Sequence, residues 1–93
     1  MGKRILEDHD RWMREDPTYR EAYESQEAEF AVAEALIKAR AAAGMTQADM
    51  AAALGVKQPA VARIEAGKNV SIRTLAKYAR ALKRRVKIDL VEV

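Results

Sequence analysis

The 93-residue chain contains no cysteine, one histidine, two prolines and four glycines. Without cysteine it can form no disulfide, no thiolate metal site and no cysteine nucleophile. The single histidine, His9, lies in a charged stretch with no partner motif, so we expect it to be an ordinary surface residue. The sequence also lacks a glycine-rich loop that could hold phosphate. These absences leave catalysis without a supporting group of residues, and we expect no enzymatic activity, no cofactor and no metal site.

Long apolar segments are also missing. No run of about 18 apolar residues exists that could span a membrane. The first ten residues, MGKRILEDHD, contain no apolar stretch like that of a signal peptide. We therefore expect an intracellular, cytoplasmic protein. The length allows one small domain with an appendage and a modest helical core.

The net charge of +3 conceals a division along the chain. Residues 1–34 contain 5 Lys/Arg and 10 Asp/Glu, a net charge of −5, whereas residues 35–93 contain 12 and 4, a net charge of +8. The basic part suits phosphate groups, and the acidic part should avoid DNA and favour a basic protein. A solvated helix face is the plainer explanation of the acidic stretch, and it stays open.

The most informative pattern is TQADMAAALGVKQPAVARIEAG, residues 46–67. Ala48, Ala51 and Leu54 recur at helical spacing and predict a short helix with a small apolar face. Gly55 follows where the helix must end and the chain must turn with a positive φ. This is the first half of a helix-turn-helix.

A second short helix follows the turn. Val56 is expected to fill the corner, and Pro59 suits a first helical turn because its missing N–H would have had no partner there. Val61 and Ile64 should face inward. The outward positions are Gln58, Pro59, Ala62 and Arg63. A helix with outward Gln and Arg near its start is suited to reading base edges in a major groove.

Residues 46–67 resemble the lambda-repressor/Cro-like (Xre) family of DNA-binding proteins. The resemblance implies that Gln47 holds a phosphate, that Gln58 and Arg63 read bases, and that Arg40 pairs with Glu65. Many relatives have Ser or Thr before the base-reading Gln, whereas this chain has Lys57, which cannot accept the free N–H groups but can reach phosphate. The expected DNA-contacting residues are Gln47, Lys57, Gln58, Pro59, Ala62, Arg63 and Asn69.

An N-terminal arm precedes this segment. Asp16 and Pro17 predict a helix start, and no breaker follows until Gly44. One stripe of this helix should serve the core: Val32, Leu36, Ala39 and Ala43. A second stripe is left over: Tyr19, Tyr23, Gln26, Phe30, Ala33 and Ile37. The second stripe is either core for the N-terminal segment or a surface for another chain, and we favour the surface. The expected partner-binding residues are Trp12, Met13, Tyr19, Tyr23 and Phe30.

The C-terminal part predicts one helix and one strand. Ser71 should cap a helix whose buried face is Ile72, Leu75, Ala79 and Leu82. The tail VKIDLVEV alternates apolar and charged residues, which predicts a β-strand. A lone strand needs a partner for its backbone groups, and its own copy across a two-fold axis suits a protein that reads palindromic DNA. The expected dimer residues are Val86, Ile88 and Leu90.

Taken whole, the chain resembles the HigA-type antitoxins of toxin–antitoxin modules, through its acidic aromatic arm and its terminal strand. The resemblance implies a homodimeric repressor of its own operon that also silences a basic RelE/HigB-like, mRNA-cleaving toxin in the bacterial cytoplasm, and that is nucleoid-associated when bound to DNA. Its partners would be palindromic operator DNA and the toxin. Two alternatives stay open: a stand-alone Xre repressor without a toxin, and an interaction adaptor that has lost DNA binding.

The sequence thus predicts an all-α fold: a lambda-repressor-like helix-turn-helix domain with an N-terminal helical arm and one short C-terminal β-strand that pairs across a dimer. The expected segments are a toxin-binding arm over residues 1–31, a DNA-binding domain over 32–85 and a dimerisation strand over 86–93.

Overall fold

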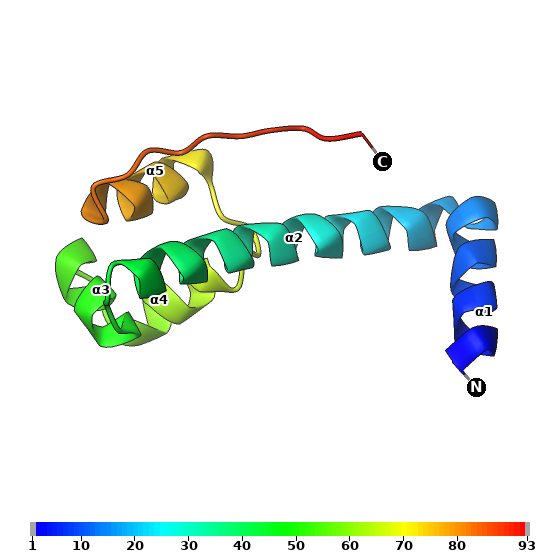
Figure 1. The fold of residues 1–93 in the computed structure, drawn as a ribbon, viewed down its shortest axis with the longest axis horizontal. Coiled ribbons are helices and arrows are strands. Elements are labelled where there is room, and N and C mark those ends of the chain that lie inside the picture. The colour runs from blue at the N-terminus through cyan, green and yellow to red at the C-terminus, as the bar shows by residue number, and fades with distance from the viewer. Residues whose placement is uncertain (1, 93) are drawn as a thin grey trace.

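The computed structural model describes the backbone of residues 2–92 and the side chains of residues 9–92. Within this range the chain forms five helices: α1 Gly2–Glu15, α2 Pro17–Ala42, α3 Gln47–Leu54, α4 Gln58–Glu65 and α5 Ile72–Ala81. The helices α3, α4 and α5 gather around the C-terminal half of α2, and α1 crosses the opposite end of α2 (Figure 1). The predicted all-helical helix-turn-helix architecture is confirmed. No described helix has both the length and the apolar character that crossing a membrane requires.

Residues at the helix starts explain where each helix begins. The Asp16 carboxylate accepts hydrogen bonds from the backbone N–H groups of Thr18 and Tyr19 at 3.0 and 3.1 Å, and Pro17 takes the first position of α2. Helix α2 then runs for 26 residues, so the expected boundary at residue 31 lies inside one continuous helix. The arm and the first helix of the helix-turn-helix domain are therefore joined rigidly rather than by a linker.

The short helices α3 and α5 begin at side-chain caps, of which only Ser71 was predicted. Thr46 and Asp49 form a reciprocal capping box at α3, with distances of 3.0 and 2.9 Å. The Ser71 hydroxyl accepts from the Thr74 N–H at 3.0 Å at the start of α5. Before α4, Lys57 makes no side-chain cap hydrogen bond within the described residues. The start of α4 therefore has no side-chain acceptor for its backbone N–H groups.

The core lies where α2, α3, α4 and α5 meet. Its buried residues are Leu36, Met50, Ala51, Val61, Tyr78 and Leu82. Leu36, Ala51, Val61 and Leu82 were expected, but Met50 and Tyr78, both fully buried, were not. The large side chains fill the centre because they bury the most apolar surface there.

Four positions predicted to lie in the interior are exposed: Ala43, Ala48, Val56 and Ile72. Ala43 is exposed because it is the C-cap residue at the end of α2. Ala48 is exposed because α3 turns its Met50 and Ala51 side inward instead. Val56 is 42% exposed and leaves the corner between α3 and α4 partly open. Ile72 is 68% exposed because it stands in the first turn of α5, before the helix reaches the core.

Two glycines determine turns. Gly55 ends α3 with a φ of +70°, as predicted, which only glycine adopts without strain. Gly67 follows α4 with a φ of +75°, and a Cβ there would overlap the backbone carbonyl of Glu29. The turn between α4 and α5 packs directly on α2, and for this reason nothing larger than hydrogen fits at residue 67.

The C-terminal tail runs extended beside α2 (Figure 1). Its residues up to Glu92 are assigned to neither a helix nor a strand. The predicted strand is therefore not formed within a single chain, since strand pairing needs a neighbour. Pairing across a dimer stays a prediction.

Candidate nucleic-acid interface

Helix α4, the second helix of the helix-turn-helix and the one expected to read base edges, buries one side and exposes the other. Val61 is fully buried and Ile64 is partly buried against the core, as the spacing predicts. The outward positions are all exposed: Gln58, Pro59, Ala62 and Arg63. One face of α4 is therefore open to a ligand along its length.

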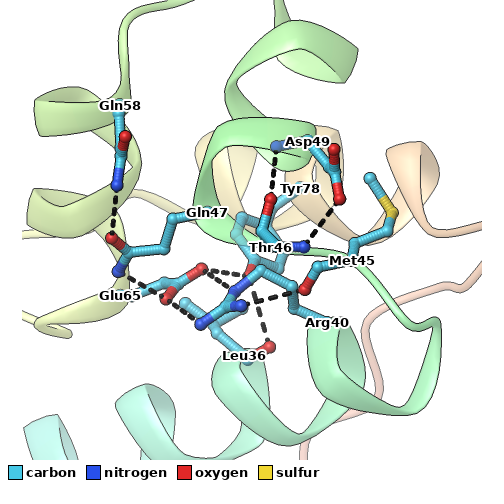
Figure 2. A network of polar contacts seen from close by, with 9 residues as sticks. All are labelled: Leu36, Arg40, Met45, Thr46, Gln47, Asp49, Gln58, Glu65 and Tyr78. Carbon is cyan, nitrogen blue, oxygen red and sulfur yellow. Dashed lines mark hydrogen bonds and ion pairs between the residues drawn. The ribbon is translucent and has the colours of Figure 1, made fainter.

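Glu65 attaches the C-terminal end of α4 to α2. Its side chain is 3% exposed, and its carboxylate accepts from Arg40 Nε at 2.8 Å and from Arg40 Nη2 at 3.1 Å. The Nη1 group of Arg40 donates to the Met45 carbonyl at 3.0 Å. Figure 2 shows this two-pronged pair at the centre of a wider network. The predicted Arg40–Glu65 pair is present.

Tyr78 completes the support of Glu65 from α5. Its hydroxyl donates to Glu65 Oε2 at 2.6 Å and lies 3.2 Å from the Leu36 carbonyl (Figure 2). Sequence reasoning missed this residue, although its i+3 spacing from Leu75 places it on the predicted buried face of α5. Side chains from α2 and α5 thus converge on one carboxylate of α4.

The network keeps Glu65 ionised. Burial by itself raises the pKa of Glu65, but hydrogen bonds from Arg40, Tyr78 and Gln47 outweigh burial and hold the pKa below its usual value. Burial raises the pKa of Tyr78, and the adjacent Glu65 carboxylate raises it further. A tyrosine that keeps its proton continues to donate to a carboxylate that keeps its charge.

A hydrogen-bond relay leads from Glu65 to the surface of α4. Gln47 Nε2 donates to Glu65 Oε1 at 3.2 Å, and Gln58 Nε2 donates to Gln47 Oε1 at 3.4 Å (Figure 2). A carboxylate can only accept, so Gln47 must turn its amide nitrogen inward and its oxygen outward. Gln58 must then turn its own nitrogen toward Gln47. The buried charge thereby fixes the orientation of both amides.

Three further residues expected to contact DNA are exposed: Lys57 and Asn69, expected at phosphates, and Arg63, expected at a base. Lys57 is exposed at the N-terminus of α4, which has no side-chain cap and where the helix dipole favours an anion. Arg63 is exposed on α4 itself. Asn69 is exposed in the turn after α4 with a φ of +51°. Their roles toward DNA stay predictions.

A comparison with known families gives a match to the domain. Residues 36–87 match the helix-turn-helix family HTH_3. The chain belongs to this family. No curated protein and no solved structure shows significant similarity to it. An HTH_3 domain makes the protein a DNA-binding transcription regulator, and the match covers Arg40, Glu65 and Tyr78 as well as α3 and α4.

The N-terminal arm, residues 1–31, lies outside the HTH_3 match, and within it aromatic rings join α1 to the first turns of α2. Ring centroids of His9 and Tyr23 lie 4.4 Å apart, and those of Trp12 and Tyr19 lie 5.3 Å apart. His9 Nδ1 lies 2.8 Å from the Tyr19 hydroxyl. The expectation of an ordinary surface histidine is therefore wrong. The i, i+3, i+4 spacing of His9, Trp12 and Met13 is the signal that places His9 on the aromatic face.

Of the five residues expected to bind a partner, three are partly buried and two stay exposed. Met13, Tyr19 and Tyr23 are half-buried between α1 and α2. Trp12 stays 44% exposed and Phe30 71% exposed. The stripe therefore serves as core for the arm over its first part and leaves two large apolar side chains on the surface.

The tail residues expected at the dimer are also exposed beside the HTH_3 domain. Val86 is 37% exposed, Ile88 61% and Leu90 96%. Val86 and Ile88 line a groove of about 400 Å³ whose other walls come from α2 and α5. The groove is lined mainly by apolar side chains, and tail residues 84–89 form one of its walls.

Proposed function

We propose that the chain is the antitoxin of a type II toxin–antitoxin module. In this role a homodimer represses its own operon through a palindromic operator, and the arm binds and neutralises a basic RelE/HigB-like toxin that cleaves mRNA. The HTH_3 family supports DNA binding. The arrangement of the arm supports the second partner.

The proposed operator reading uses the relay of hydrogen bonds. Because Gln58 turns one N–H toward Gln47, its amide oxygen and its second N–H stay available. This donor–acceptor pair matches N6 and N7 of adenine in the major groove. Arg63 would read a second base, and Pro59 and Ala62 would pack against base edges. Lys57, Gln47 and Asn69 would bind the flanking phosphates.

The observation that carries the toxin proposal is the position of the arm. Helix α1 and the first turns of α2 lie at the end of the molecule away from α3 and α4 (Figure 1). The six buried core residues all come from Leu36 onward, so the arm is not needed to complete the core. It nevertheless keeps Trp12 and Phe30 exposed. An aromatic surface that the domain does not bury is typical of a binding site for another protein.

Charge supports a basic partner at this surface. The acidic residues near Trp12 and Phe30 in the sequence are all solvent-exposed: Glu15, Asp16, Glu24 and Glu27. A protein that handles mRNA needs a basic surface, and opposite charges speed the encounter of two proteins. The aromatic anchors would supply most of the affinity, and the carboxylates most of the salt dependence.

Two full-length variants test the proposal in opposite directions. Phe30→Ala should fail to rescue growth when co-expressed with the product of the neighbouring gene, yet should bind the operator like wild type. Arg63→Ala should rescue growth but lose operator preference in a gel shift. Full rescue by Phe30→Ala and by Trp12→Ala would contradict the toxin-binding role. A chain with no growth effect beside any neighbouring gene product would favour the stand-alone repressor.

A further inference from the structure

From residue 85 to residue 92, the tail after α5 is an extended segment without hydrogen-bond partners in the described chain. Within the described chain, residues 85–92 make no hydrogen bond or ion pair to another residue. Three of its apolar side chains are well over half exposed: Ile88, Leu90 and Val91. An unpaired extended segment with apolar side chains is a template for strand pairing. Its sequence specifies which strand fits it.

We propose that two copies of this chain pair antiparallel through residues 84–92, with Ile88 facing Ile88 of the second copy across the two-fold axis. This register deepens the dimer that the proposed repressor requires. It sets Val86 opposite Leu90 and Lys87 opposite Asp89. It also sets Arg84 opposite Glu92. Every apolar residue on the Ile88 face then meets an apolar residue, and every acidic residue meets a basic one.

Other registers lose this match. A shift by two residues sets Lys87 opposite Lys87 in one direction and Asp89 opposite Asp89 in the other. A shift by one residue sets Val86 opposite Asp89 and moves the apolar side chains to mismatched faces. A parallel pair in register aligns both like-charged residues at once. Like charges directly opposite each other destabilise a strand pair, so the sequence selects one arrangement.

The groove beside the tail gives the apolar face a place to pack. Val86 and Ile88 lie along the groove, whose floor includes Ala35 of α2 and Leu75 and Ala79 of α5. In the proposed register the partner's Leu90 stands opposite Val86 and therefore over this groove. The groove holds about 400 Å³ of space, which a single chain leaves open. A second copy is thus the occupant that both the charges and the apolar residues fit.

Single cysteines can measure the register, because the full chain contains no other cysteine. Directly opposed residues in an antiparallel pair have Cα atoms about 4.5–5.5 Å apart, within the range that a disulfide spans. Ile88→Cys alone should therefore form a covalent dimer quickly under mild oxidation. Val86→Cys alone and Leu90→Cys alone should not, because each lies about four residues, roughly 13 Å, from its own copy. An equal mixture of these two variants should cross-link as quickly as Ile88→Cys.

Charge exchange gives an independent test in the full chain. Lys87→Asp places two like-charged pairs in the homodimer, and Asp89→Lys does the same with the opposite sign. Each variant alone should raise the dimer Kd by about tenfold or more, as two cross-strand pairs change from attraction to repulsion. Mixing the two variants restores opposite charges at both pairs, so the mixture should associate as tightly as wild type in analytical ultracentrifugation.

Different failures identify different errors. Cross-linking of Val86→Cys alone as fast as Ile88→Cys, or no recovery on mixing the charge variants, would overturn the proposed register. If wild type still bound a palindromic operator as a dimer, the proposed function would stand without this register. The expected cross-linking pattern in a protein that bound no operator and rescued no growth would keep the pairing and end the proposed function.

Discussion

Replacing Glu65 with alanine removes the group on which three parts of the fold converge. The carboxylate accepts hydrogen bonds from Arg40, Tyr78 and Gln47, and it is 3% exposed. Alanine leaves the Arg40 guanidinium and the Tyr78 hydroxyl in the interior without their main acceptor. Removing one member of a buried ion pair is more costly than removing both, because an uncompensated charge stays behind.

The magnitude follows from what each stranded group retains. Arg40 keeps its hydrogen bond to the Met45 carbonyl, and its side chain is 15% exposed. The Tyr78 hydroxyl keeps the Leu36 carbonyl at 3.2 Å. These residual contacts place the loss at the lower end of the range of about 3–5 kcal/mol for a broken buried pair. For a chain of this size about 3 kcal/mol lowers the Tm by about 12–24 °C.

Thermal unfolding followed by circular dichroism at neutral pH measures this loss. Glu34→Ala is the matched control, because the Glu34–Lys38 pair is also close, at 2.7 Å, but its side chains are 64% and 74% exposed. Its melting curve should overlay that of wild type. A Glu65→Ala protein that melted within a few degrees of wild type would refute the reasoning that this carboxylate holds α4 to α2 and α5.

Three further outcomes are expected. Because the pKa of Glu65 is lowered, its contribution to stability is complete above about pH 4.3, the value in the unfolded chain, and is lost as pH falls through the pKa of the folded state. Urea unfolding at a series of pH values should show this loss of stability in wild type but not in Glu65→Gln. Arg63→Ala should weaken operator binding by about 1–3 kcal/mol and relax sequence preference, whereas Lys57→Ala should weaken binding to all DNA sequences alike and reduce the slope of the salt dependence by about one. Unchanged discrimination between DNA sequences by Arg63→Ala in gel shifts would contradict the assignment of Arg63 to a base. Gly67→Ala should lower the Tm more than Gly44→Ala: both glycines have a positive φ, but only at Gly67 does a Cβ overlap the Glu29 carbonyl. Equal melting temperatures of the two variants would argue against that close approach.

The local features of the fold were predictable because neighbouring residues determine them. Asp16, Thr46 and Ser71 cap helices through bonds to residues two or three positions away. Gly55 ends α3 because its backbone alone needs a positive φ. The Arg40–Glu65 pair spans 25 residues, and it was predictable only through the resemblance to a known family.

Long-range packing was harder to predict, as Tyr78 shows. Helical spacing places Tyr78 on the buried face of α5, but a hydroxyl is buried only where it finds a partner. That partner, Glu65, lies 13 residues away on another helix. His9 was misjudged for the same reason. Its hydrogen-bond partner Tyr19 lies on α2, a different helix that begins after α1 ends. Periodicity gives the face of a helix, whereas the polar partner across the interface depends on the tertiary structure.

The length of α2 reconciles the two opposite charges of the chain. If residues 1–34, with a net charge of −5, lay beside a DNA-binding surface, they would repel the phosphates that the basic part should bind. Between Glu24 and Arg40 the continuous helix rises about 24 Å, at about 1.5 Å per residue. This is about three Debye lengths at physiological salt, so the repulsion is largely screened. In the proposed function, an unbroken α2 therefore keeps the acidic residues of its first turns, where the basic partner would bind, away from α3 and α4, where DNA would bind.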